Sequence, residues 1–174
     1  MSDLVRVAVD AMGGDYAPVE PVKGAVEAVN ADERVKVQLV GQVDVIEKEL
    51  QKYTYPKERV EIVPATEIIE TGEPPVNAIR HKKDSSIVVG MKKVRYGEAD
   101  AFVSSGSTGA VLVGGQTIVG RIKGVERPPL APLIPTKDGV SLLIDCGANV
   151  DARPSHLVQF AMNGFHLYGT RCRH

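Results

Sequence analysis

The sequence predicts an α/β fold in which a largely parallel sheet is covered by helices. Short β-branched runs alternate along the chain with segments whose apolar residues recur at helical spacing. The 17 glycines and 11 prolines cluster where the apolar runs stop, as expected of turns between elements. A chain of 174 residues with 43% hydrophobic residues is long enough for one globular domain with its own core.

Five runs are short, apolar and rich in β-branched residues, which is typical of buried strands. They are residues 4–9, 35–40, 60–63, 101–104 and 141–144. Five segments between or after them have helical spacing of apolar residues. They are residues 19–29, 43–50, 75–94, 108–119 and 154–167. Because parallel neighbours need crossover connections, usually helices, this alternation predicts parallel strands.

Composition excludes several classes of protein. The 21 Lys and Arg are offset by 22 Asp and Glu, for a net charge of −1, so we expect no nucleic-acid partner. The longest mostly apolar stretch, 110–119, is much shorter than the roughly 20 residues that span a bilayer. No secretion signal is recognisable, and Cys146 and Cys172 form no metal-binding or disulfide pattern. These observations predict a soluble, cytoplasmic protein.

Functional residues are expected just after the strands, because ligands of open parallel sheets bind beyond the carboxyl ends of the strands. Three strand ends carry polar residues and glycine, in segments 10–15, 104–110 and 145–151. The sequence predicts that all three meet at one edge of the sheet.

The second of these segments is the sharpest candidate for an anion site. Small hydroxyl residues and glycines between a strand and a helix expose consecutive backbone N–H groups, where an anion fits. The alternative is that Ser105 or Ser107 only caps the helix and the glycines only turn the chain. The segment matches neither GxGxxG nor a Walker A loop. The candidate phosphate-binding residues are Ser104, Ser105, Gly106, Ser107, Thr108 and Gly109.

A basic run, Arg80 to Lys83, is a second candidate for recruiting phosphate. Its alternative interpretation is a solvated helix face. The sequence shows no Gly-x-Ser-x-Gly elbow and no recognisable Cys/His signature. Cys146 lies in a tight turn, where a small residue is more typical of packing than of catalysis.

Six motifs, in this order along the chain, resemble the phosphate acyltransferase (PlsX) family. The resemblance extends from about Val5 to Ala161. The motifs are DAMGGD (10–15), IRHKKDSS (79–86), SSGSTGA (104–110), RP followed by LIPT (127–136), DCGANVD (145–151) and HLVQFA (156–161).

The resemblance implies a three-layer α/β/α fold similar to phosphotransacetylases and isocitrate-dehydrogenase-like enzymes. It also implies conversion of acyl-acyl-carrier-protein and inorganic phosphate into acyl phosphate and free carrier protein, in bacterial phospholipid synthesis. A homodimer associated peripherally with the membrane is implied, and we expect no cofactor and no metal. The alternatives are a phosphotransacetylase-like enzyme that uses acyl-coenzyme A, and an inactive fragment that only binds phosphate or carrier protein.

The roles of the site residues follow from this chemistry. Phosphate itself can attack a thioester, and a thiol with a pKa of about 8.5 leaves readily as the thiolate, so the protein needs no nucleophile. Residues 104–109 are predicted to cradle phosphate, Arg80 and Lys83 to offset its charge, and Asn149 to donate to phosphate or the oxyanion. The predicted orienting residues are Asp10, Gly13, Gly14 and Asp145; Mg²⁺ binding by Asp10 and Asp145 is the alternative.

The chain departs from the family pattern in two places. Ser105 and Ser107 replace an alanine and an asparagine, and both are small enough to keep the loop. After Ala161 the sequence drifts away, whereas the family continues for a further half of similar length. We therefore expect an acyltransferase-like domain at 1–161, a divergent tail at 162–174, and an N-terminal half that lacks part of the site.

Overall fold

The computed structural model describes residues 4–137, 139–147 and 151–171. Its elements, in chain order, are β1 (Val5–Asp10), α1 (Val19–Ala31), β2 (Val35–Gly41), α2 (Val43–Leu50), η1 (Lys57–Arg59), β3 (Val60–Pro64), α3 (Pro75–His81), α4 (Ser86–Arg95), β4 (Ala101–Val103), α5 (Thr108–Gly114), η2 (Gly115–Val119), β5 (Leu133–Thr136), β6 (Gly139–Leu142) and α6 (Pro154–Arg171). They form two compact units, Met1–Gly120 and Arg121–His174.

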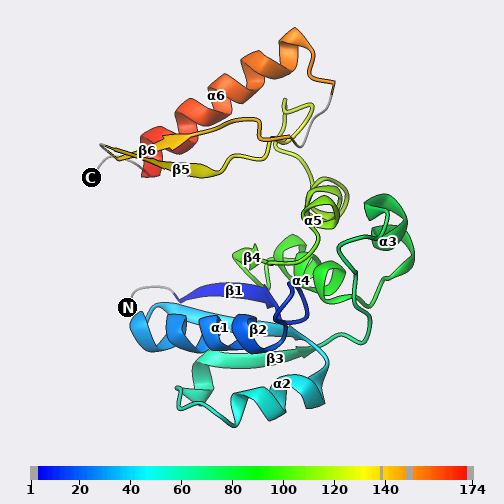
Figure 1. Cartoon of the computed structure of the whole chain (residues 1–174), viewed down its shortest axis with the longest axis vertical. Coiled ribbons are helices and arrows are strands. Elements are labelled where there is room, and N and C mark those ends of the chain that lie inside the picture. The colour runs from blue at the N-terminus through cyan, green and yellow to red at the C-terminus, as the bar shows by residue number, and fades with distance from the viewer. Residues whose placement is uncertain (1–3, 138, 148–150, 172–174) are drawn as a thin grey trace. The chain divides into compact units, whose positions relative to one another are not determined.

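The first unit contains a four-stranded sheet in the order β3-β2-β1-β4, and every pair of neighbours is parallel. The predicted α/β fold with a parallel sheet is therefore confirmed. From β1 the chain passes through α1 to β2 on one side, whereas β4 pairs on the other side of β1 (Figure 1). The order of the strands thus reverses between β1 and β4, which is where open α/β sheets bind their ligands.

Alternation along the strands divides the core between the two faces of this sheet. Val37 and Leu39 of β2 pack with α1 and α2 on one face, as part of a cluster that includes Val22 and Ile46. Val40, the next residue of β2, belongs instead to a cluster on the other face, against which side chains of α4 pack. Helices on both faces of the sheet make the predicted three layers (Figure 1).

The single helix predicted at 75–94 is two helices, α3 and α4. Ser85 ends the break by capping α4, and its side chain accepts a hydrogen bond from the N–H of Val88. Asp84 is held by Thr66, whose hydroxyl and N–H both donate to its Oδ2. Periodicity alone missed the break because the apolar spacing continues across it, whereas these two polar side chains interrupt the helix.

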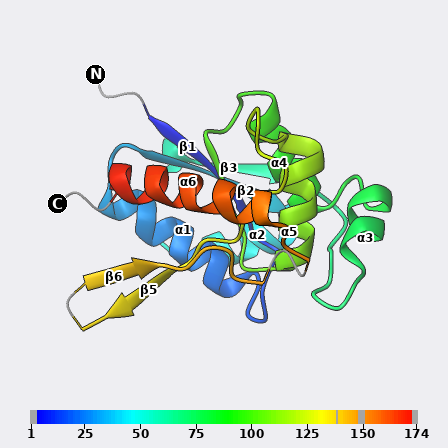
Figure 2. The same cartoon turned by 90° about the horizontal axis from the view of Figure 1, so that it is seen from above.

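The second unit consists of a β-hairpin and a long helix. Strands β5 and β6 pair antiparallel, from Leu133 with Leu142 to Thr136 with Gly139 (Figure 2). The strand predicted at 141–144 is thus displaced to Gly139–Leu142, and it pairs with β5 in a separate two-stranded sheet. The expectation that this run is a strand of the parallel sheet is therefore wrong.

The first unit ends at Gly120, and α6 runs without interruption through Ala161. The proposed domain at 1–161 and tail at 162–174 stay a prediction. None of the helices in the described ranges combines the length and the hydropathy needed to cross a bilayer.

Candidate phosphate site

The candidate site lies where β1 and β4 end side by side. Val9 of β1 pairs with Val103 of β4 in parallel register, so the chain leaves both strands in the same direction. Segment 10–15 follows β1 directly, and residues 104–109 follow β4. Two of the three segments singled out in the sequence therefore meet, at the reversal point of the sheet.

A hydrogen bond between side chains joins the two segments. The hydroxyl of Ser104 donates to Oδ2 of Asp10 at 2.7 Å, and the N–H of Met12 donates to Oδ1 of the same carboxylate at 3.1 Å. Asp10 is only 1% exposed, and its two oxygens are both occupied as acceptors. This arrangement suits a residue that orients loops, because a buried carboxylate is stable only when it is hydrogen-bonded.

Glycines allow the two segments to touch. A Cβ atom on Gly13 would lie 2.3 Å from Oδ2 of Asp10 and 2.9 Å from the nitrogen of Gly106. At Gly14, φ is +99°, and a Cβ atom would lie 2.8 Å from Oγ of Ser105. Ser105 completes the junction by donating its hydroxyl to the carbonyl of Gly13 at 2.9 Å. Side chains at Gly13 or Gly14 would separate the loops.

The structure divides the candidate residues into those that hold the loop and those with free donors. The hydroxyls of Ser104 and Ser105 are both used within the junction, and the N–H of Gly106 donates to Oγ of Ser104 at 3.0 Å. Among the described residues, no acceptor takes the N–H groups of Ser107, Thr108 and Gly109. These three groups belong to the N-cap residue and the first two residues of α5, where backbone N–H groups carry partial positive charge.

Ser107 fits both interpretations that the sequence left open. Its Oγ accepts a hydrogen bond from the N–H of Ala110 at 3.3 Å, so it caps α5. Ser107 is only 3% exposed, and its capping hydrogen bond holds the unpaired N–H groups in place. Thr108 is exposed, and its hydroxyl has no acceptor among the described residues. Capping and anion binding are therefore compatible in this loop.

Helix α3 begins beside this loop, at Pro75. A Cβ atom on Gly109 would lie 2.5 Å from Cγ of Pro75, so Gly109 is required for the contact. Sequence reasoning missed Pro75; its signal is a Pro-Pro pair opening a helix that follows β3. Arg80 lies five residues further along, about 7.5 Å along the helix axis. Arg80 and Lys83 are both exposed, and Nζ of Lys83 donates to the carbonyl of Ile79 at 3.2 Å.

Ionic and polar contacts fix both ends of α3. Lys82 pairs with Glu73 and also donates to the carbonyl of Ile68. The hydrogen bond from Lys82 is the main cause of a lowered pKa at Glu73, and the one from Thr66 is the main cause of a lowered pKa at Asp84. These contacts hold the start of α3, and with it Pro75, against residues 104–109.

The third segment lies in the second unit. Oδ1 of Asp145 accepts a hydrogen bond from the N–H of Leu130 at 2.6 Å. The N–H of Cys146 donates to the carbonyl of Leu130. Asp145 thus fixes the proline-rich segment before β5. Asn149 lies outside the described residues. Within the described ranges, no three His, Cys, Asp or Glu side chains cluster as metal ligands do.

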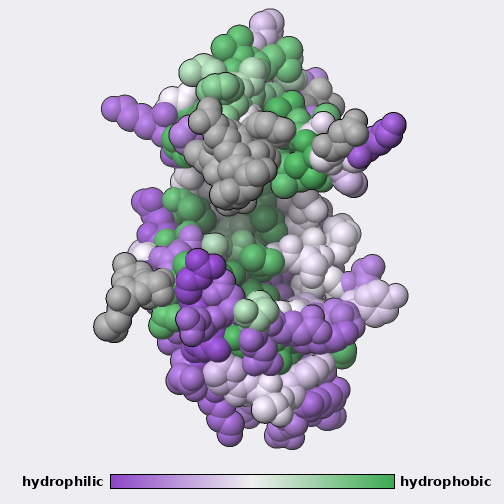
Figure 3. Space-filling view, turned by 90° about the vertical axis from the view of Figure 1, so that its left-hand side faces the viewer, coloured by the Kyte–Doolittle hydropathy of each residue, from purple (hydrophilic) through white to green (hydrophobic). Residues whose placement is uncertain are grey.

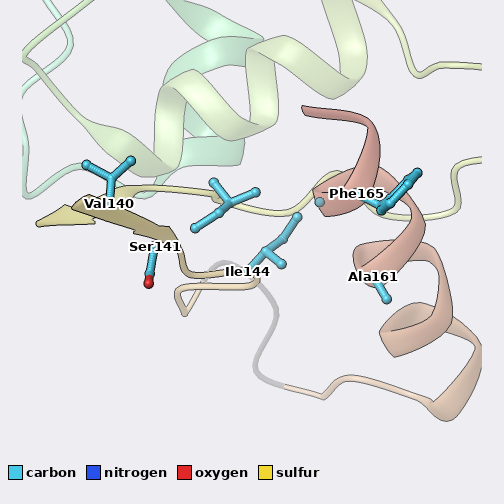
Figure 4. A pocket seen from close by; sticks show the side chains of 7 residues that line it. Val140, Ser141, Ile144, Ala161 and Phe165 are labelled. Carbon is cyan, nitrogen blue, oxygen red and sulfur yellow. The ribbon is translucent and has the colours of Figure 1, made fainter. Parts of the chain in front are cut away.

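The second unit also holds a pocket of about 430 Å³ between its hairpin and α6 (Figure 4). Its lining is apolar apart from one hydroxyl and contains no charged side chain. The lining residues are Val140, Ser141, Leu142, Ile144, Ala161, Gly164 and Phe165. Such a pocket suits an apolar group, not phosphate.

Solved structures of known proteins share this fold. The phosphotransacetylase from Streptococcus pyogenes matches 95% of this chain and 54% of its own length, with a TM-score of 0.71 at 16% identity. The EutD phosphotransacetylase from Staphylococcus aureus matches 96% of this chain and 53% of its own length, with a TM-score of 0.69 at 17% identity. The expected likeness to the phosphotransacetylase fold is confirmed.

Relatives found by sequence comparison share a much higher identity with this chain. The phosphate acyltransferase of Clostridium beijerinckii is 51% identical over 160 residues, and that of Alkaliphilus oremlandii is 50% identical over 161. Both alignments cover 92% of this chain and 48% of the relative, so the chain spans about half the length of these curated relatives. The family model described as "Fatty acid synthesis protein" matches residues 5–172. The chain belongs to this family of fatty acid synthesis proteins, which the sequence motifs indicated as the phosphate acyltransferases.

Proposed function

We propose that residues 104–109 bind inorganic phosphate, and that the protein takes part in transferring an acyl group to this phosphate from acyl-acyl-carrier-protein. The observation that carries the proposal is the set of N–H groups of Ser107, Thr108 and Gly109, which have no acceptor in the described ranges. They lie at the reversal point of the sheet, held by the loop that follows β1. The names of the relatives support the acyltransferase class.

The reaction needs positioning and charge stabilisation more than a protein nucleophile. A phosphate oxygen attacks the thioester carbonyl carbon, the carbon–sulfur bond breaks, and sulfur leaves as the thiolate. The N–H groups of residues 107–109 would hold the phosphate, and the hydroxyl of Thr108 would orient it. Arg80, near the end of α3, and Lys83, just after it, are proposed to offset its charge. Phospholipid synthesis in bacteria is the proposed setting, with carrier protein and a second copy of the chain as proposed partners.

Acyl-coenzyme A is the alternative acyl donor. The phosphotransacetylase neighbours show likeness of fold alone at 16–17% identity, whereas relatives near 50% identity are named phosphate acyltransferases. Acyl-phosphate formation by a chain extended to the relatives' length, measured with each donor in turn, distinguishes the two. The 174-residue chain alone is expected to be inactive in the same assay.

Phosphate binding can be tested on the chain as it stands. In an amide-resolved NMR titration with inorganic phosphate, the N–H signals of Ser107, Thr108 and Gly109 are expected to shift together and to saturate. Arg80→Ala is expected to weaken this binding by about 1.5–3 kcal/mol if the guanidinium pairs with phosphate. Signals that do not move at saturating phosphate would refute the site, and unchanged affinity in Arg80→Ala would make Arg80 part of a solvated face.

A further inference from the structure

The direction of the hydrogen bonds around Asp10 determines what Ser104 can offer to a ligand. Both carboxylate oxygens of Asp10 accept, one from the N–H of Met12 and the other from the hydroxyl of Ser104. A serine hydroxyl has one hydrogen and two lone pairs. The hydrogen of Ser104 is committed to Asp10, and one lone pair accepts the N–H of Gly106. Ser104 therefore has one lone pair left and no hydrogen to donate.

This lone pair belongs to a residue that is only half-buried and that begins the proposed phosphate loop. The free N–H groups of the loop follow three residues later, at Ser107. An anion that fills the loop would thus meet donors on the turn of α5 and an acceptor at Ser104. An acceptor is satisfied only by a ligand that carries a hydrogen of its own.

Phosphate and sulfate differ in this one property. At neutral pH inorganic phosphate keeps one or two hydrogens on its oxygens, whereas sulfate keeps none. Sulfate has the size, shape and charge of dibasic phosphate, but all four of its oxygens are acceptors. In this loop one of them would face the lone pair of Ser104 without a hydrogen between them, which costs the desolvation of both groups.

We infer that Asp10, acting through Ser104, makes this loop selective for an anion that carries a P–OH hydrogen, so that phosphate is bound in preference to sulfate. The inference rests on the proposed function, because it takes residues 104–109 as the phosphate site. Asp10 is a positioning residue here: it fixes the direction of the Ser104 hydroxyl and does not itself touch the anion.

One substitution should reverse the polarity of this contact. In Asp10→Asn the new amide group can donate to Oγ of Ser104, which frees the hydroxyl hydrogen of Ser104 to point toward the ligand. The loop would then offer a donor where the original offers an acceptor. Ser104→Ala tests the same step without the new amide, because it removes the acceptor altogether.

Calorimetric titration of the 174-residue chain at pH 7 with phosphate, arsenate and sulfate provides the test. We expect phosphate to bind at least about tenfold more tightly than sulfate, the effect of one charge-assisted hydrogen bond. Arsenate, which also keeps a hydrogen, should bind like phosphate. Asp10→Asn and Ser104→Ala should each lose most of the preference, chiefly because sulfate binds more tightly than before.

Asp15→Asn is the matched control. It removes the same charge from the same segment, but Asp15 is exposed and its carboxylate has no hydrogen-bond or ion-pair partner among the described residues, so the preference should stay. Equal affinity of the original chain for phosphate and sulfate would overturn the inference and leave an anion site in place. A preference that survives in both Asp10→Asn and Ser104→Ala would overturn it as well. Failure to bind either anion would instead refute the proposed function.

Discussion

The two units of the chain cover their apolar side chains to very different degrees. In the first unit both faces of the sheet are covered, and residues such as Leu39 and Ile87 are buried in clusters that include helix side chains. In the second unit large apolar side chains are exposed on the hairpin and on α6, and hydrophobic residues gather over that unit in Figure 3. The exposed side chains of α6 include Leu157, Val158, Met162 and Phe165.

The sequence of α6 shows that this exposure is a property of the helix. Residues 155–170 contain no Asp, Glu, Lys or Arg, whereas a solvent-facing helix normally carries charges on its outer face. At 100° per residue, the exposed side chains at 157, 158, 161, 162 and 165 form one continuous stripe. A stripe of this kind is typical of an interface. We therefore expect the first unit to be stable without a further surface against it, and the stripe on α6 in the second unit to need a cover.

The largest expected effect on stability comes from substituting two phenylalanines of α6, one buried and one exposed. Phe160 is 2% exposed and Phe165 is 83% exposed, so the same substitution should have a large effect on stability at one position and almost none at the other. Phe160→Ala is expected to lower the free energy of unfolding by about 3–5 kcal/mol, because it leaves a cavity. Phe165→Ala should change it by less than about 0.5 kcal/mol. Urea unfolding of both variants measures the difference, and equal losses would show that the stripe is covered within the chain.

In the first unit the corresponding contrast is between two glycines. Gly13→Ala places a Cβ atom 2.3 Å from the Asp10 carboxylate, and we expect it to cost about 1–3 kcal/mol of unfolding free energy by overpacking. Gly24 lies in α1 with nothing within 4 Å of a new Cβ atom, so Gly24→Ala should add about 0.5–1 kcal/mol. Thermal unfolding compares the two. A Gly13→Ala variant as stable as Gly24→Ala would mean that the loops do not interlock.

The sequence predicted the first unit better than the second, for physical reasons. The strands of the parallel sheet appear in the sequence as apolar runs, and the ends of two of these runs correctly predicted that Asp10 and residues 104–109 meet. The hydrogen-bond partners of the hydroxyls of Ser104 and Ser105 were not predictable, because they depend on the pairing of β1 with β4. Asp10 and Ser104 are 94 residues apart in the sequence.

The prediction for the second unit was wrong because an apolar run indicates a strand but does not indicate which strand it pairs with. The run at 141–144 is apolar enough for a parallel sheet, yet β6 pairs with β5, a segment outside all five predicted strands. Pro135 lies inside β5, and proline in a run argues against a central strand. In a two-stranded hairpin both strands are edges, so proline is tolerated there.

Association in solution is a smaller effect that tests the same stripe. We expect the 174-residue chain to self-associate through α6. Phe165→Lys should weaken its association constant by about tenfold or more, because a charge would replace an aromatic side chain that association buries. Tyr96→Lys is the control, since Tyr96 is an exposed aromatic residue of the first unit. Light scattering against concentration measures both, and a monodisperse monomer at all concentrations would mean that the stripe needs no cover.

Acid should produce the smallest effect, and it should fall on the first unit. The pKa of Asp32 is lowered from 3.8 to about 2, first by its side-chain hydrogen bond from Arg34, and the pKa of Asp100 is lowered by its hydrogen bond from Arg6. Both folded pKa values lie below the unfolded ones, so these carboxylates stabilise the fold above about pH 4 and lose that contribution as pH falls toward 2. The pairs are exposed, so the loss is small and is reduced further by salt.

Urea midpoints of unfolding, measured at pH 7, 4 and 2.5, should fall mainly between pH 4 and 2.5, and Asp32→Asn should make that fall smaller. A midpoint that stays level between pH 4 and 2.5 at low salt would show that these pairs do not contribute to the stability of the first unit.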